Sequence, residues 1–178
     1  MALLTGILGR INDLIAKLAM ALAMAIVAFT VLALFGGAAT RYLTGTGYDW
    51  LMELPPMMMP WLVFLLLGVL LRSQTHISVD FLPPKLSWRG QKMLRLVCNS
   101  IAFGAAIVFF IAGIDAVALF QMLGQVTEME IEFPIWYIYL SFPVGFAILA
   151  SFAAEMVLRD LHDLLHPDHP LQQPGATP

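Results

Sequence analysis

The sequence predicts an all-α membrane protein with four transmembrane helices, both termini in the cytoplasm and short interfacial helical segments. Hydrophobic residues make up 60% of the chain and charged residues only 12%, whereas a soluble domain carries about 25% charged residues. Four apolar segments approach or exceed the roughly 20 residues that cross a bilayer as a helix. These segments show no strand-like alternation, which argues against a membrane β-barrel.

One membrane domain is expected over residues 1–166, followed by a disordered, proline-rich cytoplasmic tail over residues 167–178. The four spans are expected at about residues 14–39, 54–71, 97–120 and 135–158. The first apolar stretch has one charge, Lys17, near its start. It is far longer than the roughly 7–15 apolar residues of a signal-peptide core, so we expect a retained span.

The N-terminal region and the first span have helical patterns. Residues 3–15 place apolar side chains at helical spacing, which predicts an interfacial helix leading into the membrane. The span itself is rich in alanine (Ala19, Ala21, Ala23, Ala25 and Ala28). Small side chains let neighbouring helices approach closely, so the alanines predict a packing face.

The second span begins with an unusual cluster of prolines and methionines. If its helix begins near Leu54, Pro60 falls inside the helix and should bend it. Pro55 and Pro56 would then lie in the first turn, where a missing N–H costs little. The three methionines at 57–59 point in different directions on a helix, which favours flexible packing over soft-metal binding.

The charges of the connections predict the orientation of the chain. Basic residues lie in the N-terminal segment (Arg10, Lys17) and in the second connection (Arg72, Lys85, Arg89, Lys92, Arg95). The first connection has only Arg41, and the third has glutamates (Glu128, Glu130, Glu132) and no basic residue. The positive-inside rule therefore places both termini and residues 72–96 in the cytoplasm.

No catalytic, cofactor or metal site is predicted. The stretch RSQTHISVDFLPPK at 72–85 offers one histidine and one aspartate, fewer than the three or four ligands of a zinc or iron site. The spans contain no histidine that could ligate haem. The single cysteine, Cys98, excludes an internal disulfide and a zinc site built from thiolate pairs.

Two acidic residues lie within the spans, and neither is central. An ion-coupled transporter that acts alone would carry ionisable groups at mid-membrane depth. Asp115 is about five residues from the outer end of its span, and Glu155 is near the cytoplasmic end of the last one. Arg159 follows Glu155 at the spacing of a helical ion pair. The chain therefore reads as a subunit rather than an autonomous exporter.

Several short motifs, in order, resemble one membrane-protein family. They are Arg41-Tyr42, Asp49-Trp50-Leu-Met-Glu53, Trp61-Leu-Val-Phe-Leu-Leu-Leu-Gly68 with Arg72, His76-Ile-Ser-Val-Asp80, and Pro134-Ile-Trp136-Tyr-Ile-Tyr139 with Pro143-Val-Gly145. Together they resemble the small membrane subunit, DctQ-like, of the tripartite ATP-independent periplasmic (TRAP) transporters. The resemblance covers roughly residues 10–160, and the prolines and methionines at 55–59 depart from it.

The resemblance implies a role in a bacterial inner membrane. Such a subunit packs beside a large membrane subunit that holds the sodium and substrate sites, and braces it during uptake of an organic acid or similar solute. A periplasmic substrate-binding protein delivers the solute. The alternative is a four-helix membrane anchor or assembly subunit of an unrelated complex.

Candidate subunit-interface or structural residues follow from the motifs and from the predicted positions of the connections. They are Arg41, Trp50, Glu53, Arg72, His76, Asp80 and Trp136. Arg41 and Glu53 are expected to pair with each other, with the large subunit or with lipid headgroups. Arg72 should end the second helix at its negative dipole end. His76 and Asp80 are expected to bond locally or to the large subunit, the alternative being a solvated loop.

Overall fold

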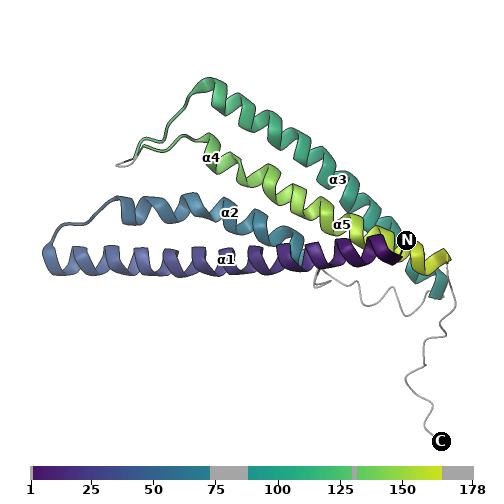
Figure 1. The fold of residues 1–178 in the computed structure, drawn as a ribbon. Helices are drawn as coiled ribbons and strands as arrows, with labels where there is room; N and C mark the ends of the chain where they lie inside the picture. Colours follow the sequence, from purple (N-terminus) through teal and green to yellow (C-terminus); the bar gives the residue numbers. More distant parts are fainter. Residues whose placement is uncertain (1, 73–87, 130–131, 166–178) are drawn as a thin grey trace, which may run out of the picture.

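A computed structural model describes residues 2–72, 88–129 and 132–165 (Figure 1). Its elements are α1 (Ala2–Thr44), α2 (Trp50–Arg72), α3 (Trp88–Leu123), the single-turn α4 (Trp136–Tyr139) and α5 (Ser141–Leu165). Four stretches are long and apolar enough to cross a membrane: Leu8–Thr44, Trp50–Arg72, Met93–Leu123 and Trp136–His162. The predicted all-α class with four membrane-spanning helices is confirmed.

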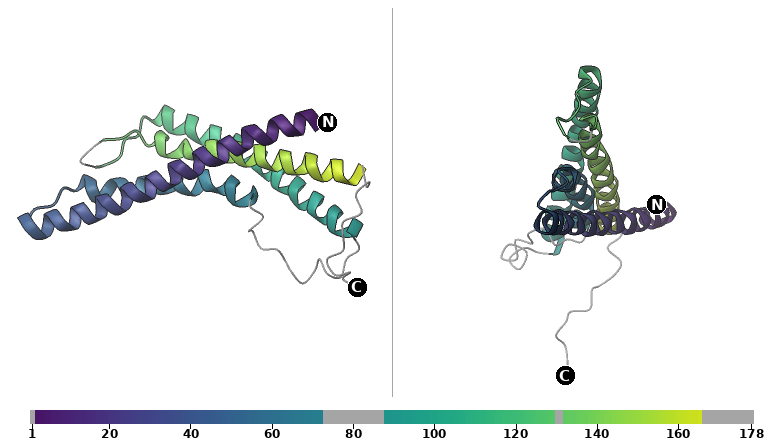
Figure 2. Two further views of the ribbon diagram at one scale, coloured as in Figure 1. Left: turned by 60° about the horizontal axis from the view of Figure 1, so that its bottom comes forward. Right: turned by 90° about the vertical axis from the view of Figure 1, so that its left-hand side faces the viewer.

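The helices form two hairpins that are joined along α2 and α5. One hairpin is α1 with α2, and the other is α3 with α5, with α4 at the entry to α5. The hairpins diverge toward their 45–49 and 124–135 connections and come together where α1 begins and α5 ends (Figures 1 and 2). Helix α5 contacts all the other helices, so it is the central element of the fold.

Helix α1 is a single continuous helix, so the predicted interfacial helix at 3–15 is not a separate element. Its apolar part, Leu8–Thr44, has 37 residues, about 55 Å at 1.5 Å per residue. This exceeds the roughly 30 Å hydrocarbon core, so α1 must tilt or extend beyond the core. Ala19 and Ala23 are buried as predicted. The other three alanines of the series are exposed, because a helix turns only every third or fourth residue toward its neighbour.

Helix α2 begins at Trp50, four residues before the position that the prolines suggested, and runs through all three of them. Backbone hydrogen bonds explain this start. The carbonyl of Asp49 accepts from the N–H groups of Met52 (2.9 Å) and Glu53 (3.0 Å), which builds a first turn before Pro55. The bend expected at Pro60 stays a prediction. The described part of the helix runs to Arg72, which places this basic side chain in its last described turn.

Glycines set the closest contacts around α5. A Cβ built on Gly145 would lie 2.5 Å from both the Cβ and the carbonyl oxygen of Phe64 in α2. Farther along, a Cβ on Gly68 would lie 3.0 Å from Ile148. On the other side of α5, a Cβ on Gly113 of α3 would lie 3.1 Å from the ring and the nitrogen of Pro143. Small residues thus bring three backbones close together, as is common between membrane helices.

The connection between α3 and α4 folds back on itself. Gly124 has a positive φ of 59°, which suits glycine where the helix ends. The N–H of Thr127 donates to the carbonyl of Phe133 (2.9 Å), and the N–H of Ile135 donates to the carbonyl of Gln125 (3.0 Å). Glu128 and Glu132 are exposed in this connection.

The contact at Gly145 generates a prediction for the joint between the hairpins. In Gly145→Ala the new methyl group would meet backbone atoms of Phe64, which cannot move as a side-chain end can. We expect this overpacking to destabilise the fold by about 1–3 kcal/mol, measured as a lower thermal unfolding midpoint in detergent. The matched control is Gly104→Ala in α3, because a Cβ there meets nothing within 4 Å. Equal midpoints for the two variants would contradict the assignment.

Candidate functional site

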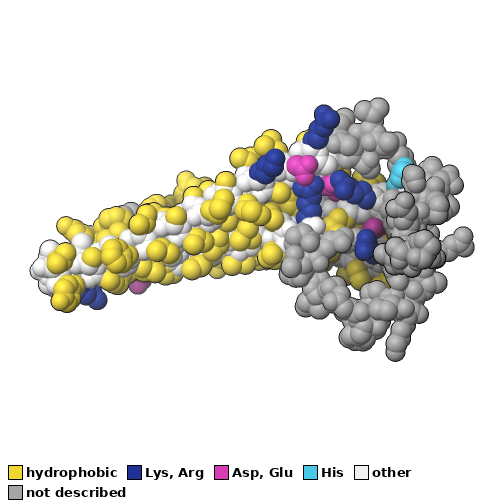
Figure 3. Space-filling view, turned by 90° about the horizontal axis from the view of Figure 1, so that it is seen from below, with side chains coloured by type: hydrophobic (Ala, Val, Ile, Leu, Met, Phe, Trp, Pro, Cys, Tyr) yellow, Lys and Arg dark blue, Asp and Glu magenta, His cyan; other side chains and the backbone are white. Residues whose placement is uncertain are grey.

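Charged side chains gather at one end of the molecule. Figure 3 shows dark blue and magenta side chains concentrated where the hairpins meet, while the rest of that face is largely hydrophobic. At this end α2 finishes at Arg72, and the last part of α5 packs against the first part of α1. The packing that joins the hairpins therefore also brings the polar side chains of α1, α2 and α5 together.

Polar side chains of α1, α2 and α5 meet at the centre of this end. We call them the polar cluster: Asn12, Asp13, Arg72, Ser151, Glu155 and Arg159. The amide of Asn12 donates to Oε2 of Glu155 (2.6 Å) and to the carbonyl of Ser151 (3.3 Å). The hydroxyl of Ser151 donates back to Oδ1 of Asn12 (2.7 Å). Asn12 is fully buried and Glu155 is 2% exposed, so these bonds hold α1 and α5 in one register.

Two arginines neutralise the buried carboxylate of Glu155. Nη2 of Arg159 lies 2.5 Å from Oε1 of Glu155, one helical turn away, which confirms the predicted pair. Nη2 of Arg72 lies 3.7 Å from the same oxygen and 2.6 Å from Oδ1 of Asp13. Arg72 thereby links α2 to both α1 and α5, and its guanidinium also lies 5.5 Å from the centre of the Phe152 ring.

Close approach of α1 makes the cluster possible. A Cβ on Gly9 would lie 3.1 Å from Nη2 of Arg159 and 3.4 Å from Oε1 of Glu155. A side chain at this position would require the ends of Arg159 and Glu155 to shift by a few tenths of an ångström. Glycine lets α1 approach the ion pair without that shift.

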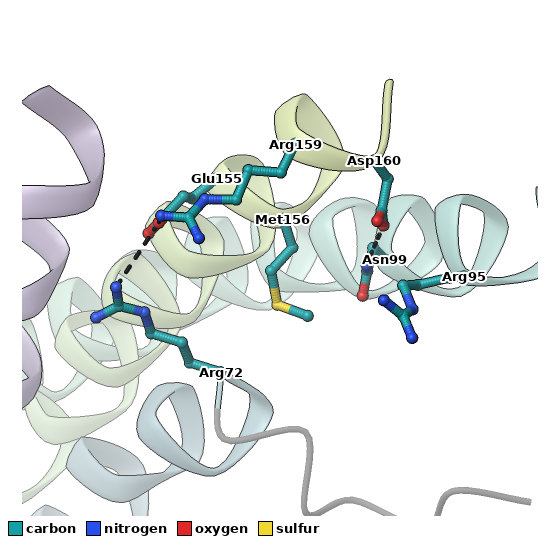
Figure 4. A pocket seen from close by; sticks show the side chains of 7 residues that line it. All are labelled: Arg72, Arg95, Asn99, Glu155, Met156, Arg159 and Asp160. Atoms are coloured by element: carbon teal, nitrogen blue, oxygen red, sulfur yellow. Dashed lines mark hydrogen bonds and ion pairs between the residues drawn. The ribbon is translucent and has the colours of Figure 1, made fainter. Parts of the chain in front are cut away.

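A cavity of about 280 Å³ lies beside the cluster, between α2, α3 and α5. Its walls include Arg72, Glu155 and Arg159 on one side and Arg95, Asn99 and Asp160 on the other (Figure 4). The amide of Asn99 donates to Oδ2 of Asp160 (2.7 Å), a second buried polar bond that ties α3 to α5.

Ion pairs and hydrogen bonds hold the helices together at this end of the molecule. In the polar cluster the carboxylates of Glu155 and Asp13 meet guanidinium groups, and the buried amide of Asn12 is hydrogen-bonded. Glu155 is the buried charge of this set, whereas Asp13 and Arg159 are more than half exposed. Loss of the arginines would leave the buried carboxylate uncompensated, which costs several kcal/mol. The arrangement fixes three helices relative to one another.

The sequence prediction included Arg72 but missed its partners. Asn12 and Glu155 are 143 positions apart. The spacing of residues within one helix cannot predict a contact over that separation. The candidate residues His76 and Asp80 lie outside the described residues. A partial signal was present, because Asn12 and Asp13 are two adjacent polar residues in the largely apolar stretch that leads into the first span.

The remaining candidate residues lie at the opposite end of α2 or at the entry to α5. Arg41 is exposed near the end of α1, and its side chain lies against Gly47. A Cβ built on Gly47 would be 3.4 Å from Nε of Arg41. Trp50 and Glu53 are half-buried in the first turn of α2. Trp136 begins α4 and stacks on Tyr137, with ring centres 3.8 Å apart. Pairing of Arg41 with Glu53 stays a prediction.

These features define a multi-pass helical membrane protein with a cluster of paired charges where its two hairpins meet. The family model of the tripartite ATP-independent periplasmic transporters, DctQ component, matches residues 30–163, and the chain belongs to this family. It is thus a small membrane component of a TRAP transporter, and the family is not an enzyme family. The predicted resemblance is confirmed.

Two relatives are similar over much of this chain. The "C4-dicarboxylate TRAP transporter small permease protein DctQ" of Pseudomonas aeruginosa is 30% identical over 137 residues, covering 72% of this chain and 65% of that protein. The "Uncharacterized protein y4mM" of Sinorhizobium fredii is 26% identical over 161 residues, covering 86% of this chain and 29% of that protein. The chain thus spans slightly under two thirds of the first relative and under one third of the second.

The buried carboxylate generates the second prediction. Glu155→Ala removes the acceptor of the buried Asn12 amide and the carboxylate that faces Arg72 and Arg159, and we expect a destabilisation of about 1–3 kcal/mol from the unsatisfied amide. Glu155→Gln should be milder, because the side-chain oxygen still accepts from Asn12. The measurement is the unfolding midpoint in detergent, with Glu128→Ala, an exposed glutamate of the α3–α4 connection, as control. A midpoint for Glu155→Ala like that of the control would refute the role of the cluster.

Proposed function

We propose that this chain is the small permease subunit of a secondary, binding-protein-dependent transporter and that it braces a large ion-coupled subunit during solute uptake. The observation that carries the proposal is the DctQ match over residues 30–163. The partners are a large TRAP membrane subunit, a periplasmic substrate-binding protein and the lipid bilayer.

An organic acid is the proposed solute class. The support is the name of the Pseudomonas aeruginosa relative, a C4-dicarboxylate TRAP transporter small permease protein. The residues that select the solute would lie on the partner chains. In y4mM the matched part is 29% of a longer polypeptide, so there a segment of this kind is covalently joined to further protein.

The bracing role is supported by how the described helices divide their surfaces. In the most apolar 18 residues of each span, 39% are buried in Trp136–His162 but only 11% in Met93–Leu123. Helix α5 is thus the more buried of these two helices, while α3 leaves most of its apolar surface uncovered. Both hairpins are locked to α5 by glycine contacts and by the polar cluster. A subunit held this firmly suits a stationary support for a moving partner.

The proposed setting is a bacterial inner membrane, with both termini and the polar cluster on the cytoplasmic side. The basic N-terminal segment and second connection support this orientation, as does the acidic α3–α4 connection. Arg41, Trp50, Glu53 and Trp136 would then lie near the periplasmic interface, where charged and aromatic side chains can contact a partner or lipid headgroups.

The orientation is testable by labelling in spheroplasts. After Cys98→Ser, Glu128→Cys should react with a membrane-impermeant maleimide added outside, because Glu128 is exposed in the acidic connection. Arg10→Cys, exposed at the other end of the molecule, should react only after lysis. The reverse pattern would overturn the orientation.

The subunit role is testable at the outer end. We propose that Arg41 and Glu53 contribute to the interface with the large subunit. Glu53→Ala and Arg41→Ala should then reduce co-purification of the large subunit severalfold, and uptake of the solute should fall in parallel. The matched control is Glu132→Ala in the α3–α4 connection, which should retain both. Wild-type complex and uptake in both variants would leave a lipid-headgroup contact as their role.

A further inference from the structure

Helix α3 carries an acidic side chain, Asp115, on a face that the rest of the described chain leaves exposed. Figure 1 shows α3 at the edge of the molecule, with α5 between it and the α1–α2 hairpin. The side of α3 that faces α5 is the buried one and includes Ala106, Gly113 and Val117. Since each residue turns the helix by about 100°, Asp115 points away from α5, and it is exposed.

Asp115 lies deeper in the membrane than the aromatic residues at this end of the molecule. Trp136, Tyr137 and Tyr139 stand together at the start of the last span, and Trp and Tyr are enriched at membrane–water interfaces. The ring of Tyr139 stacks on Phe120 of α3, with centres 4.0 Å apart. Asp115 is five residues farther into the span than Phe120, about 7–8 Å along the helix axis.

Apolar side chains flank Asp115 on both sides along the same face of α3. Some lie deeper in the span and others lie toward the α3–α4 connection, so the carboxylate is not at the edge of a polar patch. Together with Asp115 they form what we call the Asp115 face. These exposed residues are Val97, Ile101, Val108, Ile111, Leu119 and Met122.

Within the described residues Asp115 has no hydrogen-bond or ion-pair partner. An ionised carboxylate among lipid tails is unfavourable, and charged residues within spans typically face protein and pair with another group. Lipid tails supply neither a donor nor a positive charge. A second copy of this chain is a poor partner as well. Two copies related by a twofold axis along the membrane normal would bring their Asp115 carboxylates to the same depth in the contact, where like charges repel.

We propose that the Asp115 face docks against a transmembrane helix of the large membrane subunit and that a lysine or arginine on that helix pairs with Asp115. The proposal rests on the subunit role proposed above and adds the face and the chemistry of the contact. The cation satisfies the carboxylate, and the flanking apolar residues pack against the same helix. Gly104 lies on this face, and a Cβ there meets nothing within 4 Å, so the partner helix can approach closely.

The first test uses the full chain expressed together with the large subunit. Asp115→Leu should reduce the large subunit that co-purifies with a tagged small subunit about tenfold, because the cation of the partner is left unpaired in an apolar contact. Asp115→Glu keeps the charge and should retain most of the complex. The matched control is Glu128→Gln, an exposed carboxylate in the connection that follows α3, which should behave as the wild type. A wild-type amount of complex with Asp115→Leu would overturn the proposal.

The isolated chain separates a docking defect from a folding defect. Because Asp115 has no partner within the described residues, Asp115→Leu should not lower the thermal unfolding midpoint of the small subunit in detergent. A lowered midpoint would show that Asp115 acts within its own subunit, which would also overturn the proposal.

A photo-crosslinker identifies what covers the face. With p-benzoylphenylalanine in place of Ile111, one helical turn from Asp115, we expect a crosslink to the large subunit. Crosslinks only to lipid or to a second small subunit would refute the docking face while the co-purified complex still supports the subunit role. Absence of the large subunit from the wild-type preparation would refute the subunit role itself, and this proposal with it.

Discussion

The close approach of α2 and α5 at Gly145 is the contact on which the arrangement of the helices depends. The Cβ and carbonyl oxygen of Phe64 occupy the space where a side chain at position 145 would begin. This contact belongs to the main joint between the hairpins, because α5 contacts α2 more extensively than it contacts α1. Helices in lipid gain little from hydrophobic burial against one another, so close backbone packing must supply much of the attraction.

The polar cluster complements this joint at the end where the helices meet. Glycine packing brings α2 and α5 together but specifies their register weakly, since neighbouring apolar surfaces are similar. A buried amide and carboxylate are satisfied only in one register, because Asn12 must reach both Ser151 and Glu155. Arg72 extends that requirement to α2 through Asp13 and Glu155. Apolar packing thus holds the helices together, and the polar groups fix a single register between them.

Local patterns predicted the elements well and the contacts between them poorly. The apolar lengths predicted four spans, and the i,i+4 spacing predicted the Glu155–Arg159 pair. The sequence left the start of α2 open, because prolines at 55 and 56 suit a first turn near Leu54, whereas the helix begins at Trp50. The carbonyl of Asp49 accepts hydrogen bonds from the turn that precedes them instead.

The central contact of the site could not be derived in the same way. Asn12 and Glu155 meet only because two hairpins pack through α5, and hydrophobic periodicity does not say which helices are neighbours. Glycines in the sequence give a partial indication of where helices cross. Gly68 and Gly145 each stand at a close crossing, but Gly104 meets nothing within 4 Å. A glycine alone therefore does not identify a crossing.

The division of roles among the helices connects the fold to the work of a small TRAP subunit. Helix α5 is largely covered by the other helices, whereas α1 and α3 have large apolar side chains exposed along their lengths. Exposed side chains such as Leu32, Phe35 and Val108 need lipid or a partner protein as their surroundings. Since the hairpins are held together at one end and diverge toward the other (Figure 1), the outer faces of α1 and α3 are two separate apolar surfaces. Each surface can contact lipid or a partner protein independently of the other.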